Sequence, residues 1–158
     1  MTTQQKLEVA LYADLMGLTL KQPYAGLILL GKVETRTRNT EKRGWTLITS
    51  SATPYSYLDV QKISGDGQAM DIFAKLGSRG IPLIDGHAIA LVYLEHTYQI
   101  KLEHETHATY CLRSHLLSRK HFAWEFSKVI PIKPFPIKGA LGLWNANTEE
   151  IKSQIQLL

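Results

Sequence analysis

The sequence predicts a single domain of the α+β class, in which helices flank a sheet of mixed strands. Its 158 residues are 44% hydrophobic and 20% charged, a composition that suits one unit with a sizeable core. Segments with strand and helix patterns alternate along the chain. Residues 87–98 are rich in Ala, Ile, Leu, Val and Tyr, which is typical of a long central strand buried on both faces.

The first part of the chain predicts helix, strand and helix. Residues 4–16 form an amphipathic helix, because leucines recur at every fourth position: Leu7, Leu11 and Leu15. A short strand is expected at residues 18–20. Pro23 suits the first turn of a second helix, which runs to about residue 30 and ends at Gly31. Backbone amides at the start of this helix, beside Gln22 and Tyr24, can receive an anion.

The remaining elements follow from local pattern and from glycine and proline. We expect strands at residues 33–38 and 45–50, joined as a hairpin with a longer loop. Two short helices are expected within residues 57–76, divided by Gly65 and Gly67, and a loop at residues 77–82. The last strands are predicted at residues 122–130 and 141–144, and a short helix at residues 148–157. Prolines make the connection between these strands extended and stiff: Pro131, Pro134 and Pro136.

The predicted strand at residues 33–38 carries a charged row. Side chains at every second position of a strand share one side, so Glu34, Arg36 and Arg38 point together. Arginine binds phosphate or a base edge, and a neighbouring glutamate can orient it or accept from an amino group. Five basic residues lie between positions 32 and 43, against two acidic ones. The alternative is a solvated strand face with weak ion pairs.

Aromatic residues and a His/Cys series offer other candidate sites. Strand patterns bury Trp45 and Trp124 in the core, whereas Trp144 is open to either core packing or base stacking, and Tyr24 is the expected exposed stacker. Four possible metal ligands share one side of a predicted helix: His104, His107, Cys111 and His115. A straight helix brings only two such residues to one ion. We therefore expect a surface helix there and no metal site.

Several segments in this order resemble the ASCH domain family, a branch of the PUA-like fold. They are LTLKQPYAGLILLG at residues 18–31, GKVETR at 31–36, RG at 43–44, FAWEF at 122–126 and FPIKGALGLWN at 135–145. The resemblance implies a PUA-like β-barrel over residues 17–146, with an N-terminal helix at 1–16 packed on it and a tail at 147–158. It also implies a cleft beside the signature at residues 31–43.

The resemblance implies RNA or nucleotide binding in that cleft. Phosphate contacts would come from Lys32, Arg36, Arg38 and Arg43, with Glu34 reading or orienting the ligand and Tyr24 stacking. Gln22 would lie beside the stacking residue, and Lys138 can reach the same cleft. No cofactor is expected.

The resemblance also implies two other functions. Some small ASCH proteins remove the acetyl group from acetylated cytidine with a lysine, a threonine and a glutamate, and at least one relative cleaves RNA. The corresponding candidates are Lys32, Glu34, Thr35 and Glu105. The signature is two residues shorter than the usual Gly-x-Lys-x-x-Glu-x-Arg, and the position of the threonine falls on Glu34. A third hypothesis is a protein partner bound through residues 1–16.

We expect a cytoplasmic protein without a membrane partner. The longest apolar run, at residues 25–30, is too short to span a bilayer, and the N-terminus lacks the pattern of a signal peptide. The single cysteine, Cys111, cannot form an internal disulfide and suits a reducing compartment.

Overall fold

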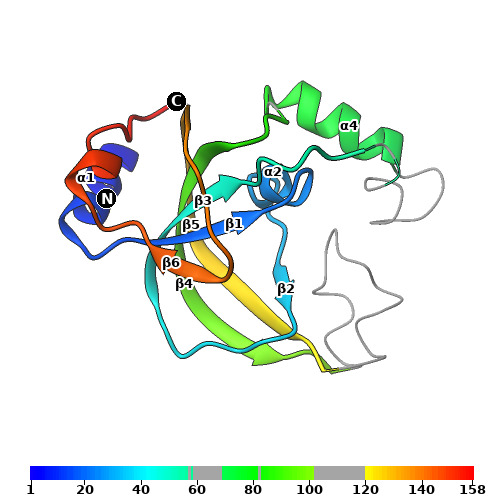
Figure 1. The fold of residues 1–158 in the computed structure, drawn as a ribbon, viewed down its shortest axis with the longest axis horizontal. Helices are drawn as coiled ribbons and strands as arrows, with labels where there is room; N and C mark the ends of the chain where they lie inside the picture. Colours follow the sequence, from blue (N-terminus) through cyan, green and yellow to red (C-terminus); the bar gives the residue numbers. More distant parts are fainter. Residues whose placement is uncertain (57, 59–68, 82, 102–119) are drawn as a thin grey trace.

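The computed structural model describes residues 1–56, 58, 69–81, 83–101 and 120–158. Its centre is a six-stranded sheet in the order β2-β5-β4-β3-β1-β6, which curls into the open half-barrel of Figure 1. The strands are β1 (Met16–Leu20), β2 (Glu34–Arg36), β3 (Gly44–Ser50), β4 (His87–Gln99), β5 (Phe122–Pro136) and β6 (Leu143–Asn145). Strand β1 runs parallel to β3, and every other pair is antiparallel. The fold class is therefore α+β with mixed strands, as predicted.

Four helices accompany the sheet in the described residues: α1 (Thr3–Tyr12), α2 (Tyr24–Ile28), α4 (Ala69–Ser78) and α6 (Glu149–Lys152). Leu7 and Ala10 of α1 pack in one hydrophobic cluster with Ile155, just after α6. Ala25 and Ile28 of α2 pack in a second cluster. Figure 1 shows α1 and α6 together at one side of the sheet and α2 at the other.

The first half of strand β4 is buried on both faces, as its apolar sequence predicts, whereas residues 95–99 are exposed or half-buried. Leu91 belongs to the first cluster, whereas its neighbours Ala90 and Val92 belong to the second. Neighbouring residues of a strand point to opposite faces, so β4 lies between the two clusters. Its pairing with β5 extends from His87↔Pro136 to Gln99↔Phe122. This long pair lies at the centre of the half-barrel.

The predicted hairpin between residues 33–38 and 45–50 is wrong. Strand β2 pairs with β5, with Glu34 opposite Trp124 and Arg36 opposite Phe122, while β3 pairs with β1 and β4. Burial explains this choice, because β3 is buried along nearly all its length and needs a partner on each side. The short β2 therefore becomes one edge of the sheet, and β6 becomes the other.

Strand β5 was expected to end before its prolines, but it continues through Pro131, Pro134 and Pro136. Strand β2 pairs with only the first three residues of β5, so most of β5 has one edge outside the sheet. Proline lacks an N–H and is tolerated at such an edge.

The predicted helices are shorter in the structure. The first ends at Tyr12, because Ala13 adopts an extended conformation, and Leu15 instead enters the core ahead of β1. The second ends at Ile28 and is followed by a turn to Gly31, whose φ of 90° suits glycine. The last is a single turn capped by Thr148. Of the helices expected within residues 57–76, α4 begins at Ala69, and residues 57 and 59–68 lie outside the described part.

Candidate functional site

The charged row of β2 divides between the interior and the surface. Glu34 is only 6% exposed, Arg36 is half-buried, and Arg38 is exposed just beyond the strand. Strand alternation places Glu34 and Arg36 on one side, as predicted. The row therefore begins inside the protein and emerges at the surface.

Lys32 and Glu34 form a buried ion pair at the inner end of this row. The Lys32 Nζ lies 3.1 Å from Glu34 Oε2, and the two side chains are 1% and 7% exposed. The second carboxylate oxygen, Oε1, accepts a hydrogen bond of 3.1 Å from the Thr35 backbone N–H. The Lys32 ammonium also lies 5.6 Å from the centre of the Tyr24 ring. Lys32, expected to bind phosphate at the surface, is thus enclosed by protein groups.

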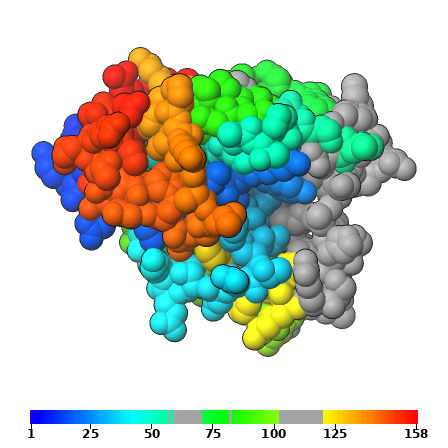
Figure 2. Space-filling view, in the orientation of Figure 1, coloured from blue at the N-terminus to red at the C-terminus, as the bar shows by residue number. Residues whose placement is uncertain are grey.

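A cleft opens at the outer end of the row, where the two edges of the sheet approach each other. Its volume is about 530 Å³. One wall is the segment after β2 and the other is the loop before β6. Figure 2 shows these two surfaces side by side, the first in cyan and the second in orange. The lining residues are Arg36, Thr37, Arg38, Asn39, Thr40, Lys42, Trp124, Leu141, Gly142 and Leu143.

The lining of this cleft has a single sign of charge. Arg36, Arg38 and Lys42 contribute three cations, and none of the lining residues is an aspartate or glutamate. Within the described residues, none of these three cations forms an ion pair. Unpaired cations along one wall of a cleft create a positive potential that attracts an anion. Leu141, which is 99% exposed, adds an apolar contact at the rim.

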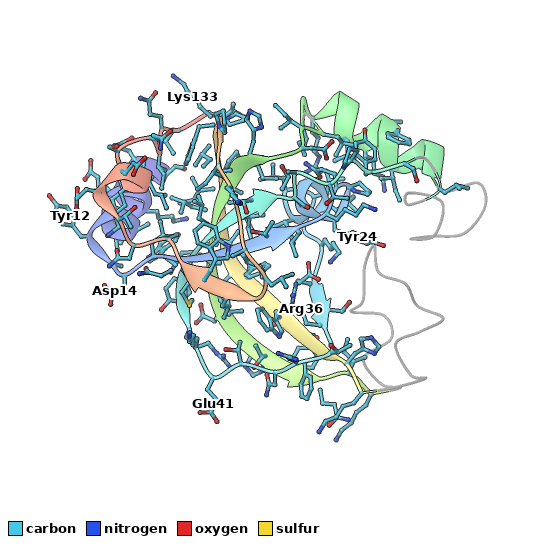
Figure 3. The ribbon with its side chains drawn as sticks, viewed as in Figure 1. Tyr12, Asp14, Tyr24, Arg36, Glu41 and Lys133 are labelled. Atoms are coloured by element: carbon cyan, nitrogen blue, oxygen red, sulfur yellow. The ribbon has the colours of Figure 1, made fainter. Side chains whose placement is uncertain are left out.

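Trp124 forms the floor of the cleft. The guanidinium of Arg36 lies 5.5 Å from the centre of its ring, and Figure 3 shows Arg36 on the side of β2 toward β6. Only 3% of Trp124 is exposed, so its predicted place in the core is confirmed. Its indole N–H is buried and has no hydrogen-bond partner in the described part of the chain. An unpaired donor of this kind costs about 1–3 kcal/mol.

Arg43 holds the wall of the cleft in place. Its Nη1 donates to the carbonyl oxygens of Thr40 at 2.9 Å and Lys42 at 2.8 Å, and its Nη2 donates to Thr97 Oγ1 at 2.7 Å. Thr97 belongs to β4, so these bonds fasten the β2–β3 loop to the central pair of strands. Arg43, expected to bind phosphate, does not line the cleft.

Comparison with known proteins identifies the architecture. No protein-family model matches the sequence, and no curated protein matches it. The crystal structure of the ASCH protein from Zymomonas mobilis matches with a TM-score of 0.58 and 15% identity, over 91% of this chain and 97% of that one. A tyrosine-to-phenylalanine variant of that protein gives 0.58 and 15%, over 91% and 100%. A serine-to-alanine variant gives 0.57 and 15%, over 90% and 97%.

This chain has the ASCH fold. The match covers nearly the whole of both chains, so it extends over the half-barrel and its helices. The fold implied by the sequence resemblance is therefore confirmed.

Two predicted binding residues of the ASCH fold lie away from the cleft, at the start of α2. Gln22 is fully buried. Its Oε1 accepts from the Gly26 N–H at 2.9 Å and its Nε2 donates to the Ile84 carbonyl at 3.1 Å. This side chain therefore anchors the helix start. Tyr24 is half-buried and packs against two core clusters.

For Trp144 the sequence left both core packing and base stacking open, and in the structure this side chain contacts β1. Its Nε1 donates to Thr19 Oγ1 at 3.1 Å, and its ring covers Gly17, where an added Cβ would lie 2.2 Å from the ring. Lys138 is exposed and does not line the cleft. Thr35 is half-buried. Glu105 and the predicted His/Cys helix lie outside the described residues.

Sequence reasoning missed most of the two walls of the cleft. The sequence predicts Lys42 only as one of the five basic residues at positions 32–43, Thr37 as part of the strand at residues 33–38, and Asn39 and Thr40 as part of the loop that follows. Leu141 was assigned to a strand, but Gly142 adopts a φ of 66° that turns the chain and leaves Leu141 exposed. This glycine is the signal that could have indicated a turn before β6.

Two negative findings concern the described residues only. No group of three or more His, Cys, Asp or Glu side chains there could hold a metal ion. None of the helices described is both long and apolar enough to cross a membrane.

Proposed function

We propose that this ASCH domain binds single-stranded RNA or a nucleotide in the cleft between the β2–β3 loop and the loop before β6. The observation that carries the proposal is the lining of three cations without a carboxylate. Arg36, Arg38 and Lys42 would contact phosphate, because guanidinium and ammonium groups pair with it strongly. The planar guanidinium of Arg36 and the exposed Leu141 would support an unstacked base.

The test is fluorescence anisotropy of a short labelled single-stranded RNA, titrated with the protein at two salt concentrations. We expect saturable binding that weakens as salt rises, with a slope of roughly 0.7 per phosphate contact on a logarithmic scale. The Arg36→Ala variant should bind more weakly and lose roughly 0.7 from that slope. The matched control is Arg79→Ala, because Arg79 lines a different, mainly apolar cavity. No binding at low salt, or equal losses in both variants, would reject the proposal.

A hydrolase is the second candidate, and the Lys32–Glu34 contact of 3.1 Å is the observation that favours it. A lysine beside a carboxylate can hold and pass on a proton, as hydrolysis of an acetylated cytidine requires. Both side chains are buried, so a substrate would reach Lys32 only if the surrounding residues moved.

Turnover of acetylated cytidine would test this candidate, and the same RNA can be checked for cleavage. Thr35→Val is the informative variant, because it removes a hydroxyl and leaves the ion pair intact. Activity of the parent that disappears in this variant would support the hydrolase. An inactive parent would remove it.

A further inference from the structure

A second groove adjoins the cleft along β6. Its volume is about 430 Å³, and it shares two lining residues with the cleft, Lys42 and Leu143. It continues past Trp144 and Asn145 to Asn147 and Asp14. Figure 3 shows Arg36 and Asp14 at opposite ends of β6. The two hollows therefore form one path that follows the edge strand, with Lys42 at their boundary.

The second groove differs from the cleft in its chemistry. It contains one cation, Lys42, and one carboxylate, Asp14. A carboxylate repels phosphate, so this groove favours a neutral polar group, whereas the cleft favours an anion. The two amides and the carboxylate supply hydrogen-bonding groups for such a neutral partner.

Hydrogen bonds fix the orientation of these groups. The Asn147 Nδ2 donates to Asp14 Oδ1 at 3.1 Å, so its Oδ1 remains an acceptor. The Asn145 Oδ1 accepts from the Asn147 backbone N–H at 2.9 Å, so its Nδ2 remains a donor. The other carboxylate oxygen of Asp14 has no hydrogen-bond partner in the described residues. The groove thus offers an acceptor on Asp14 and another on Asn147, beside the donor amide of Asn145.

We propose that the cleft and this groove are consecutive subsites for one RNA strand, and that the groove selects a base with an exocyclic amino group. This inference rests on the proposed function. The phosphate that links the two nucleotides lies at Lys42, which both hollows share. The base in the groove donates its amino group to Asp14 or Asn147, as carboxylates and amides accept from amino groups of bases. Uracil has a carbonyl at that position and leaves these acceptors unpaired.

The experiment is competition against the labelled RNA by unlabelled cytidine and uridine oligonucleotides of one to four nucleotides. Cytosine and uracil have the same size and differ at the amino or carbonyl group, so they isolate the selection. We expect affinity to rise about fivefold or more when a second nucleotide is added. We also expect cytidine oligonucleotides to bind about fivefold or more tightly than uridine ones.

Asp14→Asn should remove most of the preference for cytidine while the step at the second nucleotide remains. The control is Glu41→Gln, which removes the same charge from the β2–β3 loop without touching either lining. RNA binding without a length step or without a cytidine preference would overturn this inference and leave the proposed function standing. No binding by any oligonucleotide would overturn both.

Discussion

At the scale of single residues, we expect the buried Lys32–Glu34 pair to contribute more to stability than any exposed charge in the cleft does. Removing one partner of a buried ion pair leaves the other charge without compensation, at a cost of about 3–5 kcal/mol. We therefore expect Lys32→Ala to lower the free energy of unfolding by that amount, measured by urea denaturation. A loss below about 1 kcal/mol would contradict the enclosed pair.

The double substitution Lys32→Met with Glu34→Gln provides the control. Glutamine retains an acceptor for the Thr35 N–H, and methionine fills the space of the lysine stem. We expect most of the lost stability to return.

Tyr98 on β4 is a second residue whose environment can be measured. Loss of hydration on burial, together with a side-chain hydrogen bond and charge repulsion from Glu125, raises the pKa of Tyr98 from 10.0 to about 12. The folded state thus keeps Tyr98 protonated more strongly than the unfolded state does. This contribution to stability is fully present below pH 10 and is lost as the pH rises through about 12.

We expect the ultraviolet absorbance of tyrosinate to include a late titration that is absent in Tyr98→Phe. Glu125→Gln should shift that titration to lower pH, because it removes the nearby negative charge. Ionisation of Tyr98 near pH 10 in the parent would show that the burial and the hydrogen bond have no effect.

At the scale of elements, the β2–β3 loop owes its position to one side chain. Arg43 spans from Thr40 and Lys42 to Thr97, and only a guanidinium fork can make such divided bonds. Arg43→Lys keeps the charge and loses the fork. We expect RNA affinity to fall several-fold while the salt slope stays constant and the free energy of unfolding changes by about 1 kcal/mol.

Hydrogen exchange at residues 37–43 is the direct measurement for this variant, since a loosened loop exchanges faster. Arg79→Lys is the matched control outside the loop. An unchanged exchange rate in Arg43→Lys would show that the loop is held by other groups.

The elements also show which parts of the structure a pattern can predict. The long apolar run of β4 and the alternation of β2 are local properties, and both were predicted correctly. The partner of β2 was not predicted, because pairing depends on which strands need a hydrogen-bonded neighbour along both edges. Strand β3, buried on both faces, pairs with β1 and β4. Strand β2 therefore pairs with β5, which lies far from it along the chain.

At the scale of the whole molecule, the position of β6 depends on close packing of Trp144 over Gly17. An added Cβ at Gly17 would lie 2.2 Å from the ring, and overpacking of this kind typically costs about 1–3 kcal/mol. We expect Gly17→Ala to lower the thermal midpoint. Combining it with Trp144→Leu should recover part of the loss, so a purely additive double variant would contradict this contact.

The same scale explains why the cleft could only partly be predicted from the sequence. Arg36 and Arg38 were identified by their spacing, since alternation is local. Leu141 and Lys42 lie about a hundred residues apart and meet only because the sheet curls until its two edges approach. Gln22 and Lys32, predicted from their polar side chains to bind a ligand, are buried and bonded to other protein groups.

The open curl has one further consequence. Strands β2 and β6 are the free borders of the half-barrel, and the backbone amides at such borders exchange readily with solvent. A strand of RNA gripped by both walls would bridge those borders and complete the circumference of the barrel. The bound RNA would then take the place of the strands that would close the barrel. Amide protection on binding should therefore increase together at Glu34–Arg36 and Leu143–Asn145, two segments that do not pair with each other in the sheet.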